Sequence, residues 1–157
     1  MVHIALGMLV KMIRNYVQLL PNIATSGQPT VEQFKEIANG GYEVVINSAM
    51  PSHQDVIADE GNIVAELGMR YLHLPVPFDR PTAEHLRQFL KIMAALKGSK
   101  IWVHCIMNYR VAVFMFHYLS KIENYSDAEA TSSIFSEWTP NSEWQALLAL
   151  SSSEIGL

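Results

Sequence analysis

Short apolar runs alternate with amphipathic helical patterns along most of the chain, and this alternation restricts the possible folds more than any other feature. Four runs have the length and composition of strands, namely Ile23–Thr25, Tyr42–Asn47, Tyr71–Val76 and Ile101–Val103. Tyr42–Asn47 is apolar on both faces, as in a strand covered on two sides. The sequence therefore predicts an α/β fold with a central, mostly parallel sheet of four to five strands, flanked by helices on both faces.

Capping and stop residues delimit the helices between these runs. Thr30 and Gln33 form a capping-box pattern, which predicts a helix that runs to Asn39. Thr82 is the expected N-cap of a helix that Gly98 ends. Further helices are predicted over Asp55–Leu67 and over the apolar, buried stretch Arg110–Ile122, and from Ser126 and Asn141 onwards.

The chain has 157 residues, about the size of one ordinary domain, and half of its residues are hydrophobic. We expect a single domain over 1–157. Within it, residues 1–20 form an N-terminal extension, 20–122 the α/β core with its catalytic loop, and 123–157 the C-terminal helices.

Charge and hydropathy exclude several kinds of partner. The formal net charge is -4 and lysines and arginines do not cluster, so nucleic acid is not an expected partner. The chain lacks the run of about eighteen apolar residues that a membrane-spanning helix needs. Met1–Ile13 is apolar, and we interpret it as mature sequence, although export stays open. The oligomeric state is not predicted.

The segment Val103–Val111 carries the chemistry of this chain. It joins a predicted buried strand to a predicted buried helix, and ligands bind at the carboxyl ends of strands in open α/β sheets. A tight loop there directs backbone N–H groups inward, and the helix adds the positive end of its dipole. These groups favour a Cys105 thiolate as nucleophile, while Arg110 can grip two oxygens of an oxyanion.

The alternative interpretation of Cys105 is an inert core residue. It is the only cysteine, so neither an internal disulfide nor a cysteine-rich zinc site is possible. His73 and His117 lie on mostly apolar elements and are expected to be core residues, and no spacing suggests a metal site. A working thiol is kept most easily in a reducing cytoplasm, which is the expected location.

The segment His104–Arg110 resembles the signature of the cysteine-dependent phosphatases, which include the protein-tyrosine and dual-specificity phosphatases. More closely, the chain is similar to a bacterial phosphatase-like family known as beta-lactamase-hydrolase-like. The resemblance covers Ile23 to Leu119. Its other motifs are the Ser-Gly-Gln-Pro-Thr segment 26–30, the Gly-x-x-x-Val-Ile-Asn strand 41–47 and the Tyr-x-x-x-Pro-Val stretch 71–76.

This resemblance implies a phosphate-binding loop made of His104, Cys105, Ile106, Met107, Asn108, Tyr109 and Arg110. It also implies a cysteinyl-phosphate intermediate, with Asp79 as the general acid that protonates the leaving oxygen. The other interpretation of Asp79 is a solvated loop residue that caps the next helix. His104 is expected to orient the loop and to take no direct part in proton transfer.

The loop departs from the protein-tyrosine phosphatase pattern in three ways. Four residues, not five, separate Cys105 from Arg110. The loop contains no glycine, so we expect Asn108 to adopt the left-handed conformation that glycine usually supplies. Val111 stands where these phosphatases carry a Ser or Thr hydroxyl, which predicts slow or absent turnover.

Three functions follow from this site. The leading one is phosphomonoester hydrolysis, without a metal or organic cofactor, of a phosphoprotein or small phosphomonoester. The bulk of Ile106, Met107 and Tyr109 suggests a rim suited to an aromatic or lipid-like phosphate. The second is rhodanese-like sulfur transfer, which needs no general acid. The third is a catalytically weak module that binds phosphorylated partners.

Overall fold

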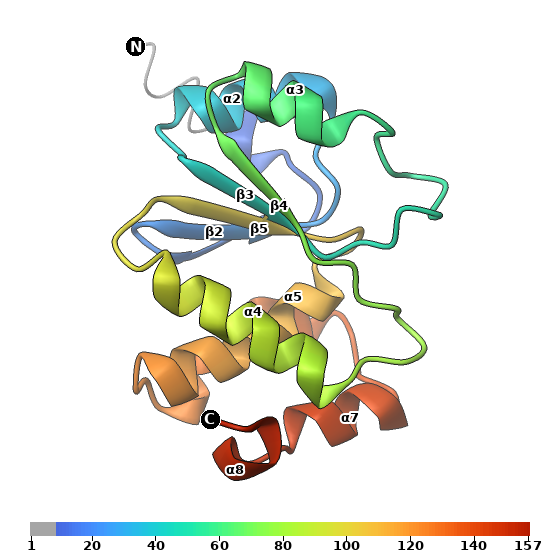
Figure 1. Cartoon of the computed structure of the whole chain (residues 1–157), viewed down its shortest axis with the longest axis vertical. Helices are drawn as coiled ribbons and strands as arrows, with labels where there is room; N and C mark the ends of the chain where they lie inside the picture. The colour runs from blue at the N-terminus through green and yellow to red at the C-terminus, as the bar shows by residue number, and fades with distance from the viewer. Residues whose placement is uncertain (1–8) are drawn as a thin grey trace.

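The computed structural model describes residues 9–157 and contains one five-stranded sheet with helices on both faces (Figure 1). The strands are β1 (Val17–Leu20), β2 (Ile23–Ser26), β3 (Val44–Asn47), β4 (Arg70–His73) and β5 (Ile101–His104), in the order β1-β2-β5-β3-β4. β2, β5, β3 and β4 are parallel, and β1 pairs antiparallel with β2 at one edge. The predicted sheet is confirmed, with β5 at its centre.

The helices form two layers. α2 (Val31–Asn39) and α3 (Glu60–Glu66) cover one face of the sheet. The other face is covered by α4 (Ala83–Ala95), α5 (Tyr109–His117) with a π-helical continuation at Tyr118–Ile122, α6 (Asp127–Ala130), a 3₁₀ turn at Ser133–Ser136, α7 (Ser142–Leu148) and α8 (Ser152–Ile155).

Each layer has its own core. On the α2 and α3 side, Phe34 and Val64 pack with Trp102, and all three side chains are fully buried. On the other side, Phe89 of α4 and Phe114 of α5 meet with ring centroids 5.2 Å apart. Because β5 is apolar and buried on both faces, it carries both cores, as expected for a central parallel strand.

The caps and most element bounds agree with the sequence predictions. The Thr30 hydroxyl accepts a hydrogen bond from the Gln33 backbone N–H, and the Gln33 side-chain oxygen accepts one from the Thr30 backbone N–H, so the capping box is formed. The predicted strand Tyr71–Val76 is wrong at its end, because the chain leaves the sheet after His73, where Pro75 has no N–H to donate.

The predicted helix Asp55–Leu67 begins five residues late, at Glu60. Residues 51–59 form turns instead, and the amide of Asp55 donates to the His53 ring nitrogen Nδ1 at 3.0 Å. This side-chain bond gives the backbone an alternative to helix, as polar side chains near a turn often do. The segment is consequently a loop at the carboxyl end of β3.

Several features were not predicted. β1 lies in the expected N-terminal extension, and α8 and the 3₁₀ turn add to the two expected C-terminal helices. The interpretation of Met1–Ile13 falls partly on residues 1–8, which lie outside the described residues. Within residues 9–157, no helix has both the length and the apolar character that crossing a bilayer requires.

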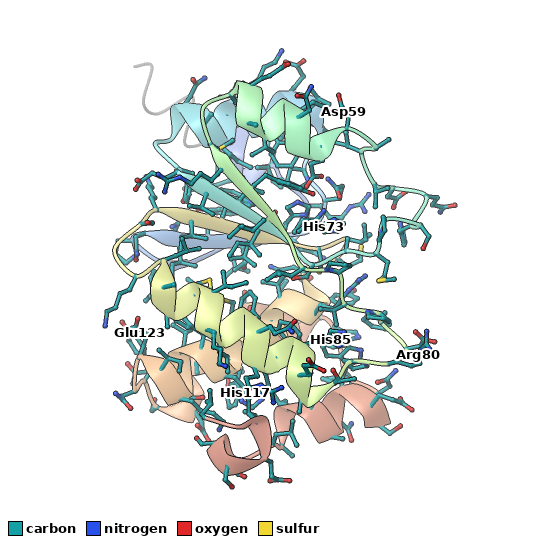
Figure 2. All side chains as sticks on the ribbon, viewed as in Figure 1. Asp59, His73, Arg80, His85, His117 and Glu123 are labelled. Carbon is teal, nitrogen blue, oxygen red and sulfur yellow. The ribbon has the colours of Figure 1, made fainter. Side chains whose placement is uncertain are left out.

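The isolated histidines have structural partners. His117 is fully buried, and its Nε2 lies 2.9 Å from the Leu147 carbonyl oxygen of α7 (Figure 2). Burial lowers the pKa of His117. The prediction that His73 is a core residue is wrong, because its side chain is exposed at the end of β4, although its ring lies 2.8 Å from the Ala49 carbonyl oxygen. In the described part of the chain, no three His, Cys, Asp or Glu side chains gather as a metal site would require.

Removing a fully buried side chain from α4 is expected to cost much more stability than removing an exposed neighbour. Leu90→Ala should lower the free energy of unfolding by about 2–5 kcal/mol, because it leaves a cavity beneath the sheet. Lys91→Ala, one residue on and exposed, should change it by less than about 0.5 kcal/mol. Urea denaturation measures both, and equal losses would contradict this packing.

Candidate active site

Three parallel strands end in register at the edge of the sheet where the candidate loop begins. Ser26 of β2 and Asn47 of β3 are both aligned with His104 of β5. The residues that follow them, including Cys105, therefore start from one edge of the sheet. This is the position at which ligands bind in open α/β sheets, and it lies at the middle of the strand order.

The carbonyl groups of the loop are held away from its centre by three donors. His104 Nδ1 lies 3.0 Å from the Cys105 carbonyl oxygen, and the backbone N–H of Gln28 donates to the Ile106 carbonyl oxygen at 2.9 Å. The Asn15 side-chain amide donates to that of Met107 at 2.8 Å. Because C=O and N–H point in opposite directions across a trans peptide, the following N–H groups face into the loop. Inward-facing N–H groups of this kind are what an oxyanion cradle requires.

Asn108 adopts the left-handed conformation with φ of 69°, as predicted from the absence of glycine in the loop. Its side chain donates to the Asn15 carbonyl oxygen at 2.9 Å and to the Thr25 hydroxyl at 3.0 Å. Both bonds tie the residue to segments outside the loop, which offsets the strain of its backbone. Asn108 is also the N-cap of α5, so the helix axis starts at the cradle.

Arg110 is buried, at 7% exposure, and its guanidinium is oriented by two backbone carbonyls. Nη1 donates to the Val76 carbonyl oxygen at 3.0 Å and to that of Ser48 at 3.3 Å. The guanidinium also lies over the Phe78 ring, 5.5 Å from its centroid. No carboxylate among residues 9–157 pairs with it, so the remaining N–H groups are available for an anion.

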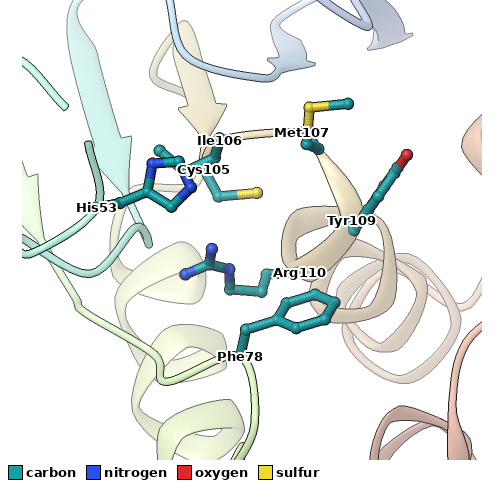
Figure 3. A pocket seen from close by; sticks show the side chains of 7 residues that line it. All are labelled: His53, Phe78, Cys105, Ile106, Met107, Tyr109 and Arg110. Atoms are coloured by element: carbon teal, nitrogen blue, oxygen red, sulfur yellow. The ribbon is translucent and has the colours of Figure 1, made fainter. Parts of the chain in front are cut away.

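A pocket of about 310 Å³ opens over the loop, and Cys105 lies at its base with 1% exposure. Figure 3 shows the Cys105 sulfur pointing into this pocket, which the Arg110 guanidinium and the His53 ring also line. The lining residues are His53, Phe78, Cys105, Ile106, Met107, Tyr109 and Arg110. The structure therefore brings the predicted nucleophile and arginine together under a mostly apolar rim.

His53 is a site residue that the sequence analysis missed. It lies on the loop after β3, in a stretch that was interpreted as running into a helix. The Asp55 amide donates to Nδ1, so in the neutral ring the proton is on Nε2, the nitrogen free to donate to a bound ligand. The available signal was its position just after a strand that neighbours β5.

Asp79 is not brought into the pocket. Its side chain is 81% exposed and lies 3.8 Å from that of Arg80, which projects from the outer edge of the loop after β4 (Figure 2). The preceding residue, Phe78, does line the pocket, and its carbonyl oxygen accepts a 2.7 Å hydrogen bond from Trp144 Nε1. Asp79 is thus adjacent to the site in sequence, with its carboxylate outside it.

A buried polar network supports the loop from behind. Glu60 and His104 are joined at 2.7 Å, with exposures of 3% and 0%. The Gln28 side chain donates to the other Glu60 oxygen at 2.7 Å. Burial would raise the pKa of Glu60, but the bond and charge of His104, with bonds from Gln28 and Tyr71, hold that pKa below its usual value. Burial raises the pKa of Tyr71.

The Ser-Gly-Gln-Pro motif supplies part of this support. Ser26 accepts a hydrogen bond from Trp102 Nε1 at 2.8 Å, and Gln28 holds both the loop and Glu60. Gly27 lies so close to the loop that an added Cβ would be 2.3 Å from the Ile106 carbonyl oxygen. A side chain at this position would displace the cradle itself.

Gly27→Ala is therefore expected to abolish most oxyanion binding. The loop backbone has to shift, and a misplacement of about 1 Å at a reacting centre lowers the reaction rate about 100-fold. Isothermal titration with vanadate measures the effect. Gly68→Ala is the control: its φ of 89° adds about 1–2 kcal/mol of strain, but no atom lies within 4 Å of the new Cβ, so vanadate binding should persist. Equal binding by Gly27→Ala would contradict the close approach.

The chain is similar over 94% of its length to an inferred phosphatase (DUF442) from Shewanella putrefaciens CN-32. The two are 32% identical, 95% of that chain is covered and the TM-score is 0.82. The fold is shared with Tk-PTP in its active form, at 20% identity, with 85% of this chain and 93% of that chain covered and a TM-score of 0.70.

It is also shared with the core catalytic domain of the PP-IP phosphatase SIW14 from S. cerevisiae, in complex with citrate. Here the identity is 16%, 91% of this chain and 89% of that chain are covered, and the TM-score is 0.71. No protein-family model matches the chain, and no curated protein matches it.

Proposed function

This chain belongs to the DUF442 family, within the cysteine-dependent phosphatase superfamily, and from that premise we propose that it hydrolyses phosphomonoesters through a phosphocysteine on Cys105. The observation that carries the proposal is the outward anchoring of three consecutive loop carbonyls around a buried thiol. That arrangement points N–H groups at the place where charge develops on a transferring phosphoryl group. The finer assignment to the beta-lactamase-hydrolase-like family stays a prediction.

The proposed reaction has two steps. The Cys105 thiolate attacks phosphorus, the bond from phosphorus to the leaving oxygen breaks, and that oxygen takes a proton from a general acid. Water then attacks the phosphocysteine, its proton passes to the same group, and the sulfur–phosphorus bond breaks to return the thiolate and release phosphate. Arg110 and the loop N–H groups bind the three non-bridging oxygens in both steps.

We propose Asp79 as the general acid. Its carboxylate is exposed, and its contact with Arg80 is an exposed ion pair of little strength, so rotation toward the pocket costs little. We propose that His53 is a second ligand of the substrate, with its Nε2–H donating to a phosphate oxygen. Neither role needs a metal or an organic cofactor.

Hydrolysis of para-nitrophenyl phosphate across pH 5 to 8 tests the activity. We expect turnover that disappears in Cys105→Ser and is inhibited by vanadate. Val111 is fully buried where a hydroxyl would assist departure of the thiolate, so turnover is expected to be slow, and Val111→Ser should raise it. Vanadate binding without hydrolysis, in both the native chain and Val111→Ser, would instead favour a binding module or a sulfurtransferase.

The proton donor is tested by comparing two variants. Asp79→Asn is expected to lower kcat by about 100-fold or more and to remove the basic limb of the pH profile, since general acids contribute about 10²–10⁴-fold. His53→Gln is expected mainly to raise KM. The reverse pattern would assign proton transfer to His53, and unchanged activity toward thiosulfate in Asp79→Asn would support sulfur transfer.

The substrate is proposed to carry its phosphate on an aromatic or apolar group. Phe78, Ile106, Met107 and Tyr109 form the rim of the pocket, and Arg110 is the only arginine or lysine that lines it. The Tyr109 ring is held by stacking on Trp138, with centroids 4.7 Å apart and planes within 2°. Aryl phosphates should therefore be turned over faster than small alkyl ones. We also propose a reducing cytoplasm as the location, because the single thiol has no disulfide partner.

A further inference from the structure

Glu60 is a buried carboxylate to which the proposed reaction gives no role. It lies on α3 with 3% exposure, and it is not among the residues that line the pocket over Cys105. It lines instead a separate cavity of about 170 Å³, together with Asn47, Tyr71 and His73. Removing a carboxylate from water is costly unless the charge is matched, so its partners are informative.

The partners of the His104 ring determine where its protons lie. Nδ1 faces the Cys105 carbonyl oxygen at 3.0 Å, which can only accept a hydrogen bond. Nε2 faces the Glu60 carboxylate at 2.7 Å, which also accepts when it is ionised. With Glu60 ionised, both ring nitrogens must therefore donate. The ring is then an imidazolium, charged by the carboxylate behind it.

We propose that Glu60 is a positioning residue for the nucleophile, which acts through His104 to place a positive charge on the outer side of the loop and so favours the Cys105 thiolate. This inference rests on the proposed function of Cys105 as the nucleophile. Its route is a chain of hydrogen bonds from Gln28 and Glu60 to His104 and then to the Cys105 carbonyl.

One peptide group transmits the effect of the His104 charge to the thiolate and to a bound phosphate. The bond from His104 polarises the peptide between Cys105 and Ile106, and the N–H of that same peptide faces the cradle. Hydrogen bonds in a chain strengthen one another in a low-dielectric environment, so this N–H becomes a better donor to the thiolate and to a bound phosphate. Phe34, whose ring is edge-on to His104 with centroids 5.8 Å apart, shields the imidazolium from water.

Other titratable groups face the network from neighbouring elements. Tyr71 and His73 of β4 border the cavity beside Glu60, while Arg110 and His53 lie on the pocket side of the loop. Of the ionisable side chains in residues 9–157, Glu60 is the one that His104 contacts as an ion pair. The charge of Glu60 therefore acts on the loop through His104, while Gln28 links Glu60 to the loop by neutral hydrogen bonds only.

Glu60→Gln separates charge from hydrogen bonding. The Gln oxygen can still accept from Gln28, and its amide can donate to His104 Nε2, which leaves a neutral ring that still donates to Cys105 through Nδ1. In this orientation the variant keeps the volume and the bonds and removes both charges of the pair, including the positive charge on His104.

The experiment measures alkylation of Cys105, the only cysteine, by iodoacetamide from pH 5.5 to 9, which does not depend on catalysis. In Glu60→Gln we expect the midpoint of the rate profile to move up by about one pH unit and the rate at pH 6 to fall about tenfold. Glu66→Gln makes the same substitution at an exposed position of the same helix, away from His104, and should leave the profile unmoved.

His104→Gln, which also lacks the positive charge but leaves the Glu60 carboxylate in place, should shift the midpoint up by at least as much, and the double variant no further. Thermal melting of each variant verifies folding. A folded Glu60→Gln with an unmoved midpoint overturns the inference, and so does a further shift in the double variant. Should Glu60→Gln not fold, an unmoved midpoint in His104→Gln overturns it equally. Absence of phosphatase activity with the shift intact would refute only the proposed function.

Discussion

An anion cradle made of backbone requires every peptide of the loop to face the same way. In this chain three successive carbonyls are each held by a different donor: the Asn15 side chain and the Gln28 backbone amide, which lie outside the loop, and the ring of His104, its first residue. A carbonyl turned inward would present a lone pair to a phosphate oxygen and would repel it. The close approach at Gly27 and the left-handed Asn108 are the local conditions under which these bonds form.

The helix α3 begins at Glu60, five residues after the predicted start, and this affects both sides of the loop His104–Arg110. Residues 51–59 form turns before the helix, and within these turns His53 lines the pocket over Cys105. Starting the helix at Glu60 places its carboxylate behind His104, in a layer shared with Phe34. The segment 53–60 thus contributes a polar ring to the pocket over Cys105 and a carboxylate to the buried side of His104.

A feature could be predicted from the sequence when residues close to it in the chain determine it. The strands, the capping boxes and the left-handed Asn108 follow from neighbouring residues, and so does the pairing of Cys105 with Arg110 across a short loop. Asn15, His53 and Glu60 could not be found in this way, because each acts through a contact with a segment far along the chain. β1 was missed for a related reason: an edge strand that is only half-buried lacks the apolar pattern of the central strands.

The loop after β4 restricts how the Asp79 carboxylate, the proposed general acid, can reach the pocket over Cys105. The Phe78 carbonyl is tied to the fully buried Trp144, and Arg110 lies over the Phe78 ring, so the loop is anchored one residue before Asp79. Pro81, just beyond, fixes a second backbone angle. For Asp79 to act as the proposed general acid, its carboxylate has to enter the pocket by rotation within Asp79 and Arg80, while Phe78 stays in place as the wall of the pocket. The proposed function thus gives proton transfer to an exposed residue and substrate contact to its anchored neighbour.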